Sequence, residues 1–96
     1  MESRGEHYVY MLKCKDGSFY TGYTTNVAER FIKHQQGKGA KYTRGRTPLV
    51  LVYQQQYESK RDAMQAEYAI KQLTRDEKLK FVKEGAVIDV ATKQLQ

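Results

Sequence analysis

Apolar, aromatic and β-branched positions predict a hairpin near the start of the chain. Residues 8–14 and 19–24 are rich in such side chains, which favour strands. Asp16 and Gly17 lie between the two runs, and glycine accepts a positive φ at little cost. The pattern therefore predicts two antiparallel strands joined by a tight turn.

The next segment has the pattern of a helix, a loop and a third strand. Asn26 followed by Glu29 has the form of a capping box, and helical spacing of the larger side chains then predicts a helix over residues 27–36. Residues 37–46 are polar and rich in glycine, which predicts an exposed loop. The apolar run over residues 49–53 is short enough to be a buried strand.

The remaining pattern predicts two more helices and a tail. Ser59 and Thr74 each begin a capping motif, so we expect a second helix up to about residue 73 and a third up to about residue 84. Residues 85–96 should form an irregular tail. The order β-β-α-β-α-α predicts a small three-stranded antiparallel sheet flanked by about three helices, an α+β sandwich within the broader α/β class.

Composition indicates one compact domain. The chain has 96 residues, 40% of them hydrophobic and 29% charged, which suits a single globular unit. The single cysteine, Cys14, cannot form an internal disulfide, and no run of about 18 apolar residues could span a bilayer. The first residues also lack the charged-then-apolar order of a signal peptide. We therefore expect a cytoplasmic protein with no membrane span.

The charge distribution favours a polyanionic partner. The chain has a formal net charge of +6, and residues 1–48 carry nine basic and four acidic side chains, against eight and seven in residues 49–96. The densest basic cluster lies in the glycine-rich loop and consists of Lys38, Lys41, Arg44 and Arg46, with Tyr42 among them. A solvated loop and a phosphate-binding loop both remain open from charge alone.

Three polar side chains on the predicted helices are candidates for a catalytic or binding role. Arg30 and His34 are four residues apart and so share one face of the first predicted helix, where they could catalyse or merely border an apolar stripe. Glu67 falls within the apolar face of the second predicted helix, and an unpaired carboxylate there would be costly to bury. Its cation could be Arg30 or a divalent metal, and the sequence leaves both open.

Five elements, in order and at matching spacing, resemble the GIY-YIG nuclease superfamily. They are Tyr8-Val9-Tyr10, Tyr20-Thr21-Gly22, Arg30, His34 and Glu67. The likeness is strongest to the small bacterial UPF0213, or YhbQ-like, group, which is similar to the nuclease subunit of the structure-specific Slx endonuclease. Residues 37–46 and 66–74 also resemble that group. The resemblance covers residues 7–84 as one nuclease-like domain and leaves residues 85–96 as a C-terminal tail.

The resemblance implies a role for each matched side chain. Tyr10 would act as general base or orient the attacking water, and Tyr20 would hold metal-bound water or the phosphate. Arg30 would clamp the phosphate, and His34 would assist proton transfer or contact the phosphate. Glu67 would bind one divalent cation, Mg²⁺ or Mn²⁺.

The resemblance also implies a surface for nucleic acid. Gly22 would let the backbone and the phosphate approach closely. The side chains expected to follow the backbone of the nucleic acid are Lys38, Lys41, Tyr42, Arg44 and Arg46. Two motifs depart from the family pattern: Tyr-Val-Tyr stands for Gly-Ile-Tyr, and Tyr-Thr-Gly for Tyr-Ile-Gly. Substrate contacts at these positions are therefore expected to differ in detail.

Tyr10 and Tyr20 can share a cleft only if the hairpin loop has the right length. A two-residue turn at the Asp-Gly pair would put Tyr10 and Tyr20 on opposite faces of the sheet. A three-residue loop over residues 15–17, with a bulge at its glycine, pairs Leu12 with Tyr20 and Tyr10 with Gly22. We therefore expect the three-residue loop, which puts both tyrosines on one face.

The leading hypothesis is a metal-dependent endonuclease that cuts DNA, at branches, flaps or single strands, in repair or recombination. The first alternative is a non-catalytic nucleic-acid-binding module, or a nuclease subunit that needs a protein partner to supply substrate specificity. A protein-interaction adaptor that retains the motifs structurally is the remaining class. A nuclease depends on Glu67 for cleavage, whereas a binding module depends on the basic loop.

Overall fold

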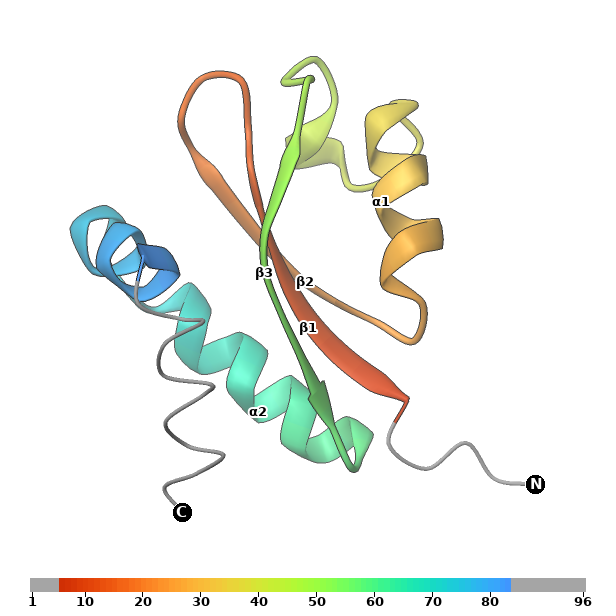
Figure 1. The fold of residues 1–96 in the computed structure, drawn as a ribbon, viewed down its shortest axis with the longest axis vertical. Coiled ribbons are helices and arrows are strands. Elements are labelled where there is room, and N and C mark those ends of the chain that lie inside the picture. The colour runs from red at the N-terminus through yellow and green to blue at the C-terminus, as the bar shows by residue number, and fades with distance from the viewer. Residues whose placement is uncertain (1–5, 84–96) are drawn as a thin grey trace.

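The computed structural model describes residues 6–83, which form a three-stranded sheet with helices on both sides (Figure 1). The strands are β1 (His7–Lys13), β2 (Phe19–Thr24) and β3 (Val50–Tyr57). They form one antiparallel sheet in the order β2-β1-β3, so β1 is central and β2 is an edge strand. The predicted three-stranded antiparallel sheet is confirmed.

The helices also follow the expected order. Helix α1 (Val27–Gln35) follows β2, and helix α2 (Lys60–Lys71) follows β3. A short 3₁₀ turn, η1 (Lys41–Thr43), lies in the loop between α1 and β3. A further helix covers residues 75–83 of the described part. The order β-β-α-β-α-α is therefore confirmed, while the end of the last helix near residue 84 and the tail over residues 85–96 lie outside the described residues.

The hairpin has the three-residue loop that a shared face requires. The Cys14 amide donates to the Ser18 carbonyl at 2.8 Å, and the Gly17 amide donates to the Cys14 carbonyl at 2.9 Å. Gly17 has a φ of +87°, a conformation that favours glycine. The strands consequently pair Leu12 with Tyr20 and Tyr10 with Gly22. The prediction of this register is confirmed, since even-numbered residues of both strands point the same way.

Strand β3 is longer than the sequence predicts. The expected run ended at Tyr53, but the strand continues through three glutamines to Tyr57, which pairs with His7. Backbone pairing with the central strand satisfies the peptide groups whatever the side chains are, so polar residues can extend a strand beyond its apolar run. The apolar pattern marked only part of the strand.

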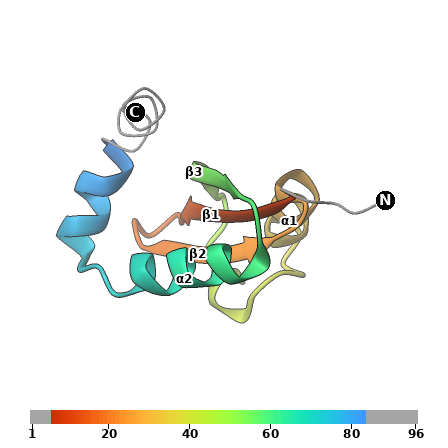
Figure 2. The same ribbon diagram turned by 90° about the horizontal axis from the view of Figure 1, so that it is seen from below.

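The sheet separates two apolar clusters. On one face Tyr10 and Leu12 pack with Phe31 of α1, and on the other Val9 and Met11 pack with α2 (Figures 1 and 2). Alternation along β1 therefore buries both faces of the central strand. Among residues 6–83 no helix has the length and apolar character needed to cross a membrane.

The helix caps follow the sequence pattern. The Asn26 side chain accepts from the Glu29 amide at 3.0 Å, and the Ser59 hydroxyl accepts from the Asp62 amide at 3.1 Å. Each cap satisfies a backbone donor that the first helical turn leaves free. These caps fix where α1 and α2 begin, and hence which of their residues face the sheet.

Candidate functional site

Tyr10 lies at the centre of the candidate site, beneath the molecular surface. Only 1% of its surface is exposed, and its ring covers Gly22 on the neighbouring strand. A Cβ atom at Gly22 would lie 2.6 Å from the Tyr10 hydroxyl oxygen and 2.8 Å from the ring carbon that carries it. Only glycine at this position leaves room for the Tyr10 phenol to lie across β2.

A chain of hydrogen bonds runs from Tyr10 through His34 to Thr43. The Tyr10 hydroxyl lies 2.7 Å from His34 Nε2, and the Thr43 hydroxyl lies 2.9 Å from His34 Nδ1. The Thr43 hydroxyl donates to the Ala40 carbonyl at 2.9 Å, so its oxygen is left to accept from Nδ1–H. The Ala40 amide, 3.4 Å from Nδ1, is a much weaker competitor. These contacts favour the Nδ1–H tautomer, in which Nε2 accepts a hydrogen bond from the Tyr10 hydroxyl.

His34 is completely buried and tightly enclosed. A Cβ atom at Gly39 would lie 2.3 Å from His34 Nδ1, so the loop after α1 can close over the imidazole only with glycine there. The Tyr20 ring packs on the other side, with its centroid 5.2 Å from that of His34. His34 is thus held by β1, β2 and the loop together.

Burial shifts the pKa values of both groups toward their neutral forms. Burial, and next the neighbouring Tyr20, raises the pKa of Tyr10, against the opposing charge and hydrogen bond of Arg30, while the Glu67 charge raises it further. Burial lowers the pKa of His34, and the charge of Arg30 lowers it again. Tyr10 is therefore a neutral phenol and His34 a neutral imidazole at pH 7.

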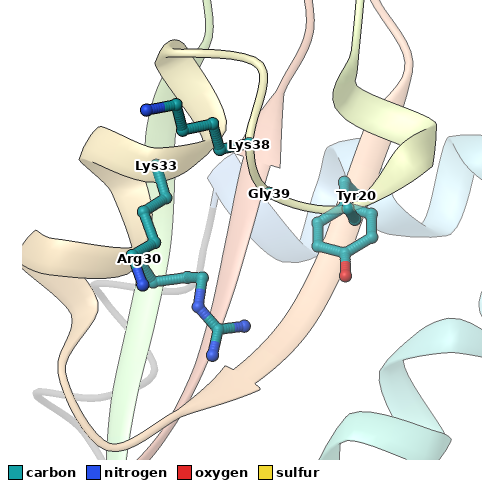
Figure 3. A pocket seen from close by; sticks show the side chains of 6 residues that line it. Tyr20, Arg30, Lys33, Lys38 and Gly39 are labelled. Carbon is teal, nitrogen blue, oxygen red and sulfur yellow. The ribbon is translucent and has the colours of Figure 1, made fainter.

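A cationic cavity opens above these buried groups. It has a volume of about 370 Å³ and is lined by Tyr20, Arg30, Lys33, Lys38, Gly39 and Ala40. Figure 3 shows the Arg30 guanidinium reaching from α1 toward Tyr20 on β2, with Lys33 and Lys38 on the α1 side. Three cations and no acid line it, so the cavity is suited to a phosphate group.

Glu67 lies on α2, which packs on the other face of the sheet, and its charge raises the pKa of Tyr10. Its side chain, on α2, is 12% exposed, and Glu67 Oε2 pairs with Lys71 Nζ at 3.1 Å. The sequence left Arg30 or a metal as the balancing cation, and the structure shows a third solution, a lysine one helical turn away. The i,i+4 spacing was the signal that could have found it.

Glu67 is the carboxylate beside the candidate site that could hold a metal ion. No group of three or more histidine, cysteine, aspartate or glutamate side chains comes together within residues 6–83. Mg²⁺ commonly keeps several waters and binds through one or two carboxylates together with substrate phosphates. Glu67, largely buried and close enough to influence Tyr10, fits that mode of binding and no closed protein cage.

The basic loop divides into exposed and structural side chains. Lys41 and Arg44 are exposed, and Tyr42 is 40% exposed. Arg46 lies over the Tyr42 ring, 4.3 Å from its centroid, donates to the Tyr42 carbonyl, and pairs with Asp16 at 3.1 Å. Arg46 therefore fastens the loop to the hairpin, and its contact with nucleic acid stays a prediction.

Two residues of this region escaped the sequence analysis. Thr43 is completely buried and orients His34, and Lys33 lines the cavity beside Arg30. Lys33 stands three residues after Arg30 on the same helix, so its spacing was a usable signal. The sequence around Thr43 contains no such signal, because its contact with His34 depends on how the loop between α1 and β3 folds back on the helix.

The chain shares sequence with a defined domain family and its relatives. The family described as the GIY-YIG catalytic domain matches residues 6–80. A UPF0213 protein of Staphylococcus haemolyticus is 58% identical over 79 residues, which cover 82% of this chain and 96% of that protein. A UPF0213 protein of Oceanobacillus iheyensis is 56% identical over 77 residues, covering 80% and 90%.

Two solved structures share the fold. The solution NMR structure of a UPF0213 protein from Bacillus halodurans has a TM-score of 0.54 and 57% identity, covering 80% of this chain and 82% of that one. That of a protein from E. faecalis has a TM-score of 0.60 and 42% identity, covering 91% and 93%. GIY-YIG nucleases typically use a divalent metal. The chain belongs to the GIY-YIG family, within its UPF0213 group of small bacterial proteins.

Proposed function

We propose that this protein is a metal-dependent endonuclease that hydrolyses phosphodiester bonds in DNA in the cytoplasm. One observation carries the proposal: Arg30 lines a cationic cavity of about 370 Å³ next to the buried Tyr10–His34 pair, and the charges of Arg30 and Glu67 both act on Tyr10. A guanidinium and a carboxylate that both influence one phenol can together contact a phosphate and a cation bound to it. Membership of a nuclease family supports the same reading.

The proposed role of each residue follows from whether its side chain lines the cavity or is buried. Arg30 and Tyr20 line the cavity and would contact the phosphate, so Arg30 would stabilise the charge that develops on it. Glu67 would hold Mg²⁺ or Mn²⁺, which polarises the phosphate and stabilises the leaving oxygen. Tyr10 and His34 are buried and neutral. The Tyr10 phenol would pass its own proton to His34 Nε2 while its oxygen takes a proton from the attacking water, which leaves His34 as an imidazolium.

The substrate class follows from the shape of the cationic surface. Lys38 lines the cavity, while Lys41 and Arg44 extend the positive surface outward along the loop. Such a surface contacts backbone phosphates and carries little sequence information. We therefore propose recognition of DNA structure, such as a branch, flap or single strand, in repair or recombination.

A binding module without turnover is the second candidate, and the ion pair of Glu67 favours it. Lys71 already balances the carboxylate at 3.1 Å, and Tyr10 is 1% exposed, so water reaches neither group freely. On that reading the protein binds nucleic acid and a partner protein performs or directs the chemistry. The two candidates make opposite predictions for cleavage by the protein alone.

The test is cleavage of labelled single-stranded, duplex, flap and branched DNA, and of RNA, with Mg²⁺ or Mn²⁺. The proposal predicts cleavage by the wild type, its loss in Glu67→Ala with binding largely kept, and normal cleavage by Glu58→Ala. Glu58 is an exposed carboxylate outside the cavity, so it controls for the loss of one negative charge. Salt-sensitive binding with no cleavage of any substrate would favour the binding module.

A further inference from the structure

A second cavity shares Tyr20 with the one that Arg30 lines. It has a volume of about 330 Å³ and is lined by Phe19, Tyr20, Thr21, Tyr42, Lys71 and Lys78. A smaller cavity of about 200 Å³ continues it, with Phe19, Tyr42 and Lys78 in common. We call the two together the β2-edge groove, because Phe19, Tyr20 and Thr21 belong to that edge strand.

The charged residues that line the larger cavity are both lysines. The Lys71 side chain is 49% exposed at the end of α2, and Lys78 is half-buried in the helix over residues 75–83. No acidic residue lines either cavity. Within residues 6–83 Lys78 makes no ion pair, so its charge is available to an anion.

The wall and floor of the groove are suited to the rest of a nucleotide. The Tyr20 and Tyr42 rings stack with centroids 6.1 Å apart, and Arg46 packs over Tyr42 to hold it. These rings offer apolar surface for a sugar or base. Thr21 is 3% exposed, and its hydroxyl has no hydrogen-bond partner among the described residues. Buried hydroxyls rarely stay unpaired, and a buried water would supply the partner beneath the floor of the groove.

The helix over residues 75–83 is fastened where it can complete this groove. It lies beside the tip of the hairpin in both views of the fold (Figures 1 and 2). Arg75 Nη1 donates to the Gly17 carbonyl at 2.6 Å, and its guanidinium lies 5.9 Å from the Phe19 ring centroid. Lys78, one turn further along, is therefore held facing β2 by a contact between distant parts of the chain.

We propose that the β2-edge groove binds a nucleotide adjoining the one whose phosphate lies at Arg30. A single strand passing Tyr20 would place one phosphate at Arg30 and Lys33 and a neighbouring phosphate at Lys71 and Lys78. This inference rests on the proposed function, because it extends the same strand beyond the cavity. It adds a binding subsite on α2 and the following helix, outside the basic loop.

Lys71 links this subsite to Glu67. Its ammonium group is 3.1 Å from the Glu67 carboxylate, the group that would hold the metal ion. A phosphate bound in the groove attracts Lys71 away from Glu67 and so leaves the carboxylate free for a cation. Strand binding and cation binding therefore strengthen each other, and the coupling must be equal in both directions.

The first experiment measures binding of labelled single strands of about eight thymidines or eight uridines, without metal, over a series of salt concentrations. We expect Lys71→Gln and Lys78→Gln each to weaken binding several-fold and to lower the slope of log K against log salt by about 0.7, the value for one phosphate contact on a single strand. Lys80→Gln is the matched control, since it removes an exposed lysine of the same helix that does not line the groove. Equal slopes for Lys78→Gln and Lys80→Gln would overturn the inference.

The second experiment measures Mn²⁺ binding by electron paramagnetic resonance, with Glu67→Gln as the blank for Mn²⁺ held by the oligonucleotide itself. In the wild type we expect the eight-thymidine strand to tighten Mn²⁺ binding. In Lys71→Gln, Mn²⁺ should bind more tightly without the strand, and the strand should add less. An unchanged coupling in Lys71→Gln would contradict the link.

The two proposals can fail separately. If Glu67-dependent cleavage is found but Lys71→Gln and Lys78→Gln bind like Lys80→Gln, the proposed function stands and the β2-edge groove is wrong. If the wild type binds neither single strand at about 50 mM salt, the β2-edge groove is wrong, and the proposed function is then judged by Glu67-dependent cleavage of the duplex, flap and branched substrates.

Discussion

At the scale of single residues, two glycines make room for the buried hydrogen-bond chain. Gly22 admits the Tyr10 phenol and Gly39 admits the His34 imidazole, and a single carbon at either position would overlap its neighbour. The chain of hydrogen bonds ends at Thr43, whose hydroxyl donates to a backbone carbonyl. Such a connected buried network fixes one geometry, because each member satisfies the next.

Replacing Gly22 by alanine should displace the Tyr10 ring. We expect Gly22→Ala to lower the free energy of unfolding by about 1–3 kcal/mol, as overpacking of a close-packed site does. In Gly22→Ala/Tyr10→Phe, the nearest atom, the hydroxyl oxygen at 2.6 Å, is absent, so the loss should be smaller than the sum of the single losses. Urea unfolding of the four proteins measures this, and additive losses would contradict the close approach.

Thr43 should set the tautomer of His34. Thr43→Val removes the acceptor for Nδ1–H, which should lower stability by about 1–3 kcal/mol and increase the population of the Nε2–H form. Thr43→Ser keeps the hydroxyl and should preserve the wild-type tautomer. The ¹⁵N chemical shifts of the imidazole distinguish the two forms, and an Nε2–H tautomer in the wild type would show that our assignment is wrong.

His34 should make stability depend on pH in the mildly acidic range. Burial lowers its pKa in the folded protein, so below about pH 6.5 the unfolded chain binds more protons than the folded one. The contribution of His34 is fully present above that pH and is lost as the pH falls toward the folded pKa. Urea unfolding from pH 7.5 to pH 5 should show a shallower fall for His34→Gln than for the wild type, and equal slopes would contradict the assignment.

Several features of the candidate site could be predicted from the sequence, because they depend on residue spacing and on local polarity. The four-residue spacing of Arg30 and His34 placed them on one face, and the apolar surroundings of Glu67 required a nearby cation. The neutral state of Tyr10 and the orienting role of Thr43 were not predictable, because both depend on packing between distant segments.

At the scale of elements, the hairpin loop decides whether the two tyrosines share a face. The three-residue loop requires Gly17 at a φ of +87°, and this register puts the Tyr10 and Tyr20 ring centroids 6.3 Å apart. The Asp-Gly pair predicted a hairpin, and only the demand for a shared cleft selected its length. The extension of β3 through polar residues was missed, because strand pairing overrode the apolar pattern.

Gly17 can be tested apart from the rest of the site. A Cβ atom there would meet Arg75 at 3.5 Å, an ordinary contact, so the cost of substitution should come from the backbone. We expect Gly17→Ala to lower stability by about 1–2 kcal/mol, and Gly17→Asn to lower it less, since asparagine tolerates the left-handed region better. Thermal or urea unfolding measures both, and equal losses would indicate a steric cause.

At the scale of the whole molecule, the sheet holds two helices apart and brings their charged side chains to one edge. Helix α1 supplies Arg30 and Lys33 on one face, and α2 supplies Glu67 and Lys71 on the other. Edge strand β2 lies where the two faces meet, and the absence of a side chain at Gly22 lets the Tyr10 phenol lie against this strand. The architecture thus places cations along β2 with one carboxylate among them.

The most direct test of the central claim is single-turnover cleavage of the best DNA substrate with Mg²⁺, comparing Glu67→Gln with Glu58→Gln. The account predicts that Glu67→Gln slows cleavage by at least about 100-fold, because it removes the one carboxylate that would hold the metal. Glu58→Gln should cleave normally, and chelation of the metal should stop all cleavage. Cleavage that persists at the wild-type rate in Glu67→Gln, or in the presence of the chelator, would contradict it.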